Sequence, residues 1–76
     1  MSEAEWLDMF ARNLREILSD YRMTQAELAE QSGLSEATIS SYMTGRKMPG
    51  AKAIINIAYV LGISTDDLID FESMIA

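Results

Sequence analysis

The sequence contains no cysteine and no histidine, and it has a single proline. Without cysteine there are no disulfide bonds, and without either residue the usual zinc sites are excluded. We expect no catalytic residues, no metal and no other cofactor. Neither a histidine base nor a thiol is present to activate a serine such as Ser40 or Ser41. An enzyme is therefore the least favoured class of protein.

Long apolar runs are also missing, because no stretch approaches the ~18–20 residues that cross a bilayer. The first residues, "MSEAEW", have neither the basic start nor the apolar centre of a signal peptide. We therefore expect a cytoplasmic protein with no membrane partner and no small-molecule ligand. The 76 residues predict a single domain, 1–76, whose modest core buries roughly 60% of the surface of the unfolded chain.

Positive charge is scarce: six basic residues face twelve acidic ones, for a formal net charge of −6. Seven of the acidic residues lie in ranges 1–10 and 64–76, which contain no basic residue, so the middle of the chain sums to +1. Acidic ends argue against strong nonspecific binding of nucleic acid, but they permit an anionic ligand if they point away from it. All the basic residues lie in the middle: Arg12, Arg15, Arg22, Arg46, Lys47 and Lys52.

The sequence does contain a series of helix starts and stops with a 3.6-residue period. "SEAE" at 2–5 and "TQAE" at 24–27 have the form of capping boxes, and "STDD" at 64–67 opens a last short segment. Glycines that follow apolar segments predict helix ends. The predicted fold is all-α, a compact bundle of five short helices. Their expected ranges are about 3–21, 24–33, 35–45, 49–62 and 64–69.

Apolar residues at spacings of three and four predict which face of each helix points inward. The expected inward residues are Leu7, Phe10, Leu14, Ile17 and Tyr21 in the first helix, Leu28 and Ala29 in the second, Ile39 and Tyr42 in the third, and Ile54, Ile57, Ala58 and Leu61 in the fourth. Trp6 and Phe10 each fit either the core or an interface, and the sequence does not decide between them.

The second and third predicted helices are joined by a tight glycine turn, which is typical of a helix-turn-helix. Ala29, four residues after Gln25, is small where the two helices approach each other, and Gly33 suits the tight turn. Ile39 and Tyr42 then anchor the third helix, which leaves its opposite face free for a groove of DNA. The set of residues is a fairly specific signal, although each residue alone is common.

In these residues the chain resembles the Cro/repressor-like (XRE-type) helix-turn-helix domains of phage and bacterial regulators. The resemblance covers residues 14–69, and it is strongest in "TQAELAEQSGLSEATIS" and "IAYVLGISTDDLI". It implies a lambda repressor-like DNA-binding domain. It also implies a homodimeric transcription regulator, with the helix from Ser35 in the major groove of double-stranded operator DNA. We expect a repressor of phage or mobile-element type.

The resemblance also implies which residues contact DNA. Helix starts can bind phosphate through backbone N–H groups, here at Thr24/Gln25, Ser35 and Gly50/Ala51. Glu36 fits two roles: a base-reading residue, and an acidic residue in the first helical turn that complements the helix dipole. The implied base-reading residues are Glu36, Ala37 and Ser41, flanked by Thr38 and Ser40. The implied backbone-contacting residues are Thr24, Gln25, Ser35, Thr44, Arg46, Lys47 and Lys52.

Three departures from the family pattern affect this interpretation. The third helix has no Arg, Gln or Asn, the side chains that usually make bidentate base contacts. Leu18 and Met43 stand where many members have an Arg–Glu ion pair, so we predict that these two side chains touch. Tyr59 stands at a usually polar position, which predicts an aromatic ring at or near the surface.

Two questions stay open at this stage. The tail "DFESMIA" at 70–76 either buries Phe71, Met74 and Ile75 or offers them to a second subunit, and we favour dimerisation through the C-terminal helices. The negative net charge, and a third helix without the usual base-contacting side chains, also motivate an alternative function. In it, the helix-turn-helix fold serves as a protein-interaction module, as in an antitoxin or antirepressor-like subunit. Arg12, Arg15 and Arg22 are interpreted as solvated charges.

Overall fold

A computed structural model describes residues 2–69, and all regular secondary structure in that range is helical. The helices confirm the all-α fold class, and each predicted bound lies within two residues of the observed one. None of these described helices combines the length and the apolar character needed to cross a bilayer. The expected cytoplasmic location stays a prediction. The helices are α1 (Glu3–Tyr21), α2 (Gln25–Ser32), α3 (Glu36–Met43), α4 (Ala51–Leu61) and α5 (Thr65–Leu68).

Local chemistry explains where these helices begin and end. Capping boxes begin three of them, formed by Ser2 with Glu5, Thr24 with Glu27 and Ser64 with Asp67. In each box the N-cap hydroxyl and a carboxylate three residues later satisfy backbone N–H groups that the helix leaves free. Ser35 caps α3 through its hydroxyl, whereas Gly50 begins α4 with no side-chain cap.

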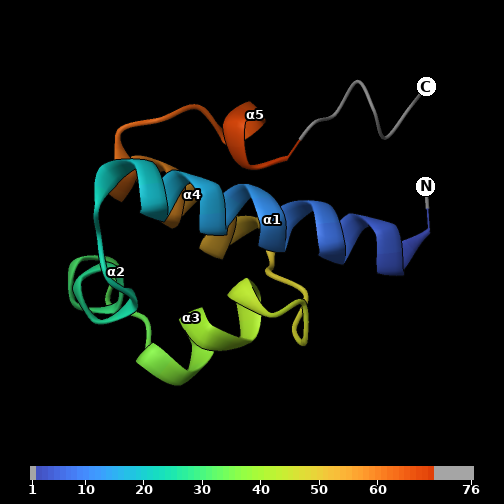
Figure 1. Cartoon of the computed structure of the whole chain (residues 1–76), viewed down its shortest axis with the longest axis horizontal. Coiled ribbons are helices and arrows are strands. Elements are labelled where there is room, and N and C mark those ends of the chain that lie inside the picture. Colours follow the sequence, from blue (N-terminus) through green and yellow to red (C-terminus); the bar gives the residue numbers. More distant parts are fainter. Residues whose placement is uncertain (1, 70–76) are drawn as a thin grey trace.

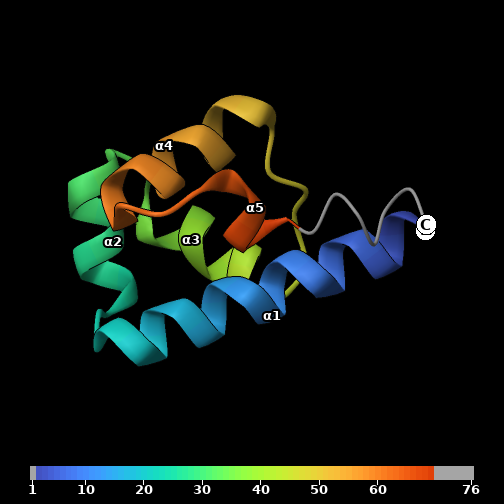
Figure 2. The same cartoon turned by 90° about the horizontal axis from the view of Figure 1, so that it is seen from above.

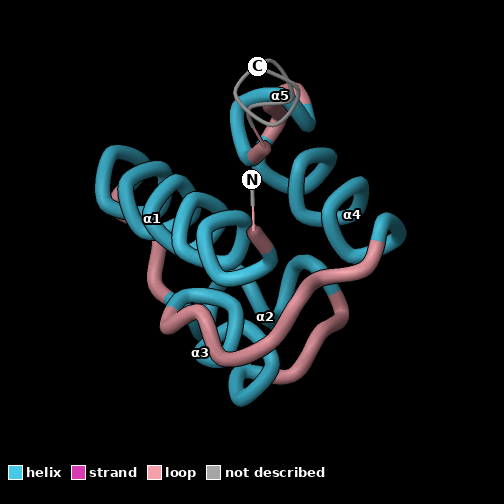
Figure 3. The backbone as a smooth tube through the Cα atoms, turned by 90° about the vertical axis from the view of Figure 1, so that its right-hand side faces the viewer, coloured by secondary structure: helices cyan, strands magenta, loops and turns pink. Residues whose placement is uncertain are grey.

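The helices enclose the core from four sides. α1 and α4 form two walls, α5 closes one end between them, and α2 and α3 close the other end (Figures 2 and 3). α1 therefore lies between α3 and α5, which appear on opposite sides of it in Figure 1. As a result, the reading helix expected from the sequence and the acidic last helix lie at opposite ends of the domain.

The predicted inner face of α1 is partly wrong. Tyr21 is 50% exposed, whereas Met9, Ala11 and Leu18 are buried beside the expected Phe10 and Leu14. A single stripe would suffice for a helix that packs against one neighbour. α1 instead contacts both α3 and α5, so it buries a wider surface that is turned away from Tyr21. The other expected residues of α1, Leu7 and Ile17, are partly buried.

The core draws side chains from every helix. Phe10 of α1 lies edge-on to the ring of Tyr42 of α3, with their centroids 6.0 Å apart and an interplanar angle of 89°. Such edge-to-face pairs add stabilisation beyond the area that they bury. Replacing a fully buried side chain by alanine typically costs about 2–5 kcal/mol. The largest fully buried side chains are Phe10, Leu14, Leu28, Ile39, Ile57 and Leu68.

Three helices have their last backbone carbonyl hydrogen-bonded by a side chain from another helix. Arg15 of α1 donates to the Met43 carbonyl at 2.7 Å, Asn56 of α4 donates to the Ser32 carbonyl at 2.6 Å, and Asn13 of α1 donates to the Leu68 carbonyl at 2.9 Å. None of the five described helices has a basic residue in its own last turn. Since the last carbonyls of a helix lack internal partners, these donors satisfy acceptors and tie the helices together.

Candidate nucleic-acid interface

The turn between α2 and α3 depends on the backbone of Gly33. This residue has φ +74°, and its N–H donates to the Ala29 carbonyl at 3.0 Å. A Cβ atom built at Gly33 would meet nothing within 4 Å. Glycine is therefore favoured here by its left-handed conformation, not by lack of space. Ala29 is buried, as expected for a small residue where the two helices meet.

α3 has one face in the core and one face toward solvent. Ile39 is fully buried and Tyr42 is nearly so, which confirms the two predicted anchors. On the opposite face Glu36 and Ala37 are exposed, while Ser40 and Ser41 are partly buried. Glu36 and Ser40 are four residues apart, as are Ala37 and Ser41, so the two pairs lie on one side of the helix. The structure thus places four of the five predicted base-reading residues on one side of α3, and Thr38 beside them is partly buried.

Hydrogen bonds within α3 decide which hydroxyl groups stay available as donors. The Ser35 Oγ donates to Thr38 Oγ1 at 2.8 Å and accepts from the Thr38 N–H at 3.0 Å. Thr38 keeps its own hydroxyl hydrogen for another acceptor. The hydroxyl of Thr44 donates back to the Ser40 carbonyl at 2.9 Å. Since a hydroxyl has only one hydrogen, Thr44 and Ser35 are weaker phosphate donors than the sequence suggests.

The start of α2 carries a negative charge. Glu27 Oε1 lies 3.0 Å from Thr24 Oγ1 and 3.3 Å from the Thr24 backbone nitrogen. This carboxylate partly satisfies the positive end of the helix and opposes a second anion at the same place. The Thr24 hydroxyl is also engaged by Glu27. Gln25, at the first position of α2, is partly buried beside this box.

The start of α4, in contrast to that of α2, carries no negative charge. Gly50 supplies no side-chain cap, and the first turn has no acidic residue. Lys52 stands in that turn and is exposed. N-terminal N–H groups without a capping carboxylate, together with a neighbouring cation, favour an anion such as phosphate. Of the three helix starts proposed from the sequence, that of α4 has the most suitable chemistry.

Arg46 and Lys47 lie in the connection between α3 and α4, and both are exposed. Between residues 2 and 69 the only ion pair joins Arg12 to Asp8 at 4.0 Å, so no described carboxylate neutralises the two cations. The connection leaves α3 through Gly45, whose φ is +71°. A Cβ there would lie 3.9 Å from the Leu7 carbonyl oxygen, so this turn passes close to α1.

The described acidic residues near the C-terminus do not share this surface. Asp66 and Asp67 belong to α5, which lies across α1 from α3 (Figure 1). The described residues also contain no cluster of three acidic side chains that could hold a metal ion. The described part of the acidic C-terminal region therefore points away from the reading helix, as an anionic ligand at α3 would require.

The contact between Arg15 and the Met43 carbonyl was missed by the sequence-based interpretation, which treated Arg15 as a solvated charge. The acceptor is a backbone atom 28 residues away, so no pair of side-chain types could reveal it. Leu18 belongs to the buried core and Met43 packs against that core, but their direct contact stays a prediction. The ring of Tyr59 is 84% exposed, which confirms its expected place at the surface.

Two packed helices joined by a left-handed glycine, with the second helix exposed on one face, define a helix-turn-helix DNA-binding domain. Residues 13–73 match the family model of the Cro/C1-type HTH DNA-binding domain, and the chain belongs to this family. The resemblance to Cro/repressor-like domains is thereby confirmed.

Related proteins carry the same class of domain. The chain is 32% identical over 65 residues to a protein of Bacillus subtilis (strain 168) named "Uncharacterized HTH-type transcriptional regulator YqaE". That match covers 86% of this chain and 56% of the relative, so the chain spans little more than half of the relative's length.

Solved structures agree with this fold. The restriction-modification controller protein C.AhdI from Aeromonas hydrophila superposes with a TM-score of 0.80 at 27% identity, over 83% of this chain and 96% of that one. The hypothetical transcription factor NHTF from Neisseria gives a TM-score of 0.82 over 100% of this chain and 91% of that one. At 23% identity, this second likeness shows the fold alone.

Proposed function

We propose that the chain is a sequence-specific transcription regulator that binds double-stranded DNA as a homodimer. α3 lies in the major groove, and binding represses a promoter of a phage or mobile element. The proposal is carried by the exposed face of α3, which Ile39 and Tyr42 hold outward beside the exposed cations Arg46 and Lys47. Membership of a DNA-binding family supports DNA as the partner.

Base readout falls mainly on the first turn of α3. Glu36 can accept a hydrogen bond from the amino group of cytosine, and Ala37 can pack against the methyl group of thymine. Both side chains are exposed, whereas Ser40 and Ser41 are partly buried and reach less far. Thr38 keeps a hydroxyl hydrogen for a base or a phosphate at the edge of this surface.

Contacts to the DNA backbone supply affinity from the connection after the reading helix and from the start of α4. The start of α4 with Lys52 provides one phosphate site, and Arg46 and Lys47 provide another. The N–H groups at the start of α3 contribute without a formal charge. Three cations per subunit predict a modest salt dependence, with a slope on the order of −5 for a dimer at about −0.9 per neutralised phosphate.

A homodimer is proposed because one short reading helix specifies only a few base pairs. Two copies related by a two-fold axis would contact half-sites about 34 Å apart, one turn of the double helix. Tyr59 of α4 lies outside the core and is 84% exposed. Its ring is a candidate contact between subunits, whereas the tail at 70–76 that the sequence favoured for dimerisation lies outside the described residues.

Selection of bound sequences from a random pool of duplexes tests the proposal. We expect an enriched motif with two-fold symmetry and half-sites about one helical turn apart. Glu36→Gln should change the preferred base at one position in each half-site. Glu16→Gln removes the same charge from an exposed position of α1 and should leave the motif unchanged.

The opposite result would favour a different partner. If no motif is enriched at low salt, the fold would serve instead as a protein-interaction module, as in an antitoxin or antirepressor-like subunit. The observation behind this second candidate is the reading face itself. Its only charge is that of Glu36, and it has no arginine, glutamine or asparagine for bidentate base contacts.

A further inference from the structure

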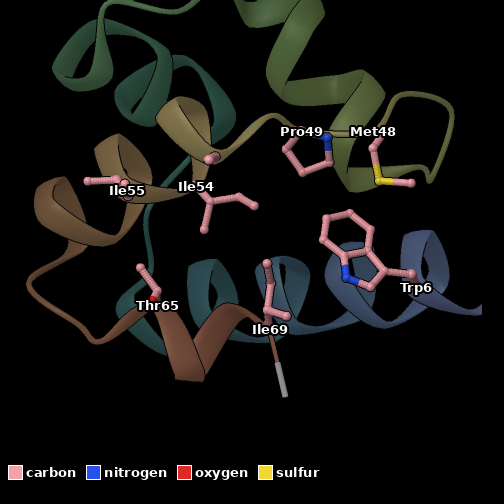
Figure 4. A pocket seen from close by; sticks show the side chains of 8 residues that line it. Trp6, Met48, Pro49, Ile54, Ile55, Thr65 and Ile69 are labelled. Atoms are coloured by element: carbon pink, nitrogen blue, oxygen red, sulfur yellow. The ribbon is translucent and has the colours of Figure 1, made fainter. Parts of the chain in front are cut away.

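An apolar groove lies on the side of the domain where α1, α4 and α5 meet the connection after α3. Its volume is about 440 Å³, which is within the range of small binding pockets. Figure 4 shows the side chains that approach this space from four separate segments. The groove is lined by Trp6, Met48, Pro49, Ala51, Ile54, Ile55, Thr65 and Ile69.

The lining is almost entirely hydrocarbon, so its occupant must be apolar. Of the eight lining residues, only Thr65 and Trp6 carry a polar side-chain atom. Met48 and Ile55 are exposed at 39% and 61%, which is high for large apolar side chains on a small domain. Covering such a surface is favourable because it removes apolar area from water.

We propose that this groove binds residues 70–76 of the same chain, "DFESMIA". The last described residue, Ile69, is buried and forms part of the groove wall, so the next residues start beside it. Phe71 follows two residues later, within about 7 Å of extended chain. Phe71, Met74 and Ile75 provide three apolar side chains in this segment.

The short tether favours this occupant over a second copy of the chain. A segment joined to its binding site by one or two residues meets that site at an effective concentration in the millimolar range. A second copy reaches the groove only at its own concentration in solution. The segment of the same chain therefore occupies the groove first.

Docking would also affect the connection that carries the two cations. Met48 and Pro49 form one wall of the groove, and Arg46 and Lys47 directly precede them. A segment packed against that wall would restrict the connection and help to hold both cations in place. This consequence rests on the proposed function, whereas the docking itself does not require DNA.

Trp6 is the single tryptophan of the chain, and it lines the groove. Its fluorescence therefore reports on the occupant. In the 76-residue chain we expect emission at shorter wavelength and weaker quenching by acrylamide than in the Phe71→Ser variant. Glu72→Ser is the matched control, because it changes a neighbouring polar residue and should leave the emission unchanged. Circular dichroism would verify that all three proteins are folded.

Two further measurements separate the possible occupants. The emission of the 76-residue chain should not change on dilution, and the Phe71→Ser variant should recover it only when a peptide of sequence 70–76 is added at about millimolar concentration. Emission that shifts with protein concentration would indicate a second copy and overturn the proposal. Identical emission from the 76-residue chain and Phe71→Ser would overturn it as well. Failure to bind DNA with the Trp6 response intact would contradict only the proposed function.

Discussion

The guanidinium group of Arg15 on α1 holds the backbone carbonyl of Met43, the last residue of α3, at 2.7 Å. A cation at the C-terminus of a helix interacts favourably with the helix dipole. Where the family pattern suggests an ion pair between positions 18 and 43, this chain has two apolar residues. Charge still links α1 to α3 here, but it acts on the backbone, so the link does not depend on the side chain at position 43.

Removing this hydrogen bond should destabilise the domain. We expect Arg15→Met to lower the free energy of unfolding by about 1 kcal/mol, a modest value because the contact is exposed. Arg12→Met is the control, since its ion pair with Asp8 is exposed and 4.0 Å long, and it should cost less than about 0.5 kcal/mol. Urea denaturation measures both. Equal effects would show that the Met43 carbonyl gains nothing from Arg15.

The glycine in the turn between α2 and α3 should resist replacement. Gly33→Ala forces a Cβ into a left-handed conformation, which costs about 1 kcal/mol, although the space is free. Gly50→Ser is the comparison, because φ is −78° there and a serine can cap α4. Its stability should be unchanged or rise by a few tenths of a kcal/mol. Thermal denaturation in which Gly33→Ala matches the parent would refute the conformational argument.

Replacing Arg22 by glycine should raise the stability of the domain, whereas replacing Gly33 by alanine should lower it. Arg22 is the one non-glycine residue with positive φ between residues 2 and 69, at +53°. Arg22→Gly removes this strain but adds freedom to the unfolded chain, so we expect a net gain of about 0.5 kcal/mol. For a domain of this size that corresponds to a melting temperature about 2–4 °C higher. Ser19→Gly, inside α1, should instead lower the melting temperature.

The contribution of Arg46 to DNA binding should be electrostatic and independent of sequence. Arg46→Ala should weaken binding to all duplexes alike and reduce the salt slope by about one per subunit. Arg22→Ala removes a charge at the C-cap of α1, away from the connection that carries Arg46, and should leave the salt slope unchanged. Titration of binding against salt concentration measures both slopes. A changed base preference in Arg46→Ala would instead place this residue at a base edge.

Much of the fold could be predicted because its signals are local. Ser2, Thr24 and Ser64 predict helix starts because each forms a capping box with a residue three positions later. Gly33 predicts a helix end because glycine readily adopts the left-handed conformation. The anchors Ile39 and Tyr42 follow from the 3.6-residue period alone. These features require no knowledge of which helices meet.

Some features could not be predicted from the sequence because they depend on tertiary neighbours, and others depend on the direction of local hydrogen bonds. The inner face of α1 could not be assigned without knowing that α1 lies between α3 and α5. Thr44 was proposed as a phosphate contact, but its hydroxyl hydrogen is used by the Ser40 carbonyl. The capping box predicted at Thr24 and Glu27 places a carboxylate at the start of α2, and this negative charge opposes the phosphate contact predicted at the same helix start.

Three helices have their last carbonyl bound by a side chain from another helix, and this arrangement makes the folding of the domain cooperative. The three contacts span 24, 28 and 55 residues of sequence, and they involve helices of eight, eight and four residues. Isolated helices shorter than about 12–15 residues are marginal in water. α2, α3 and α5 should therefore be unstructured as separate peptides and form together in one cooperative step. The reading surface then exists only when the whole domain is folded.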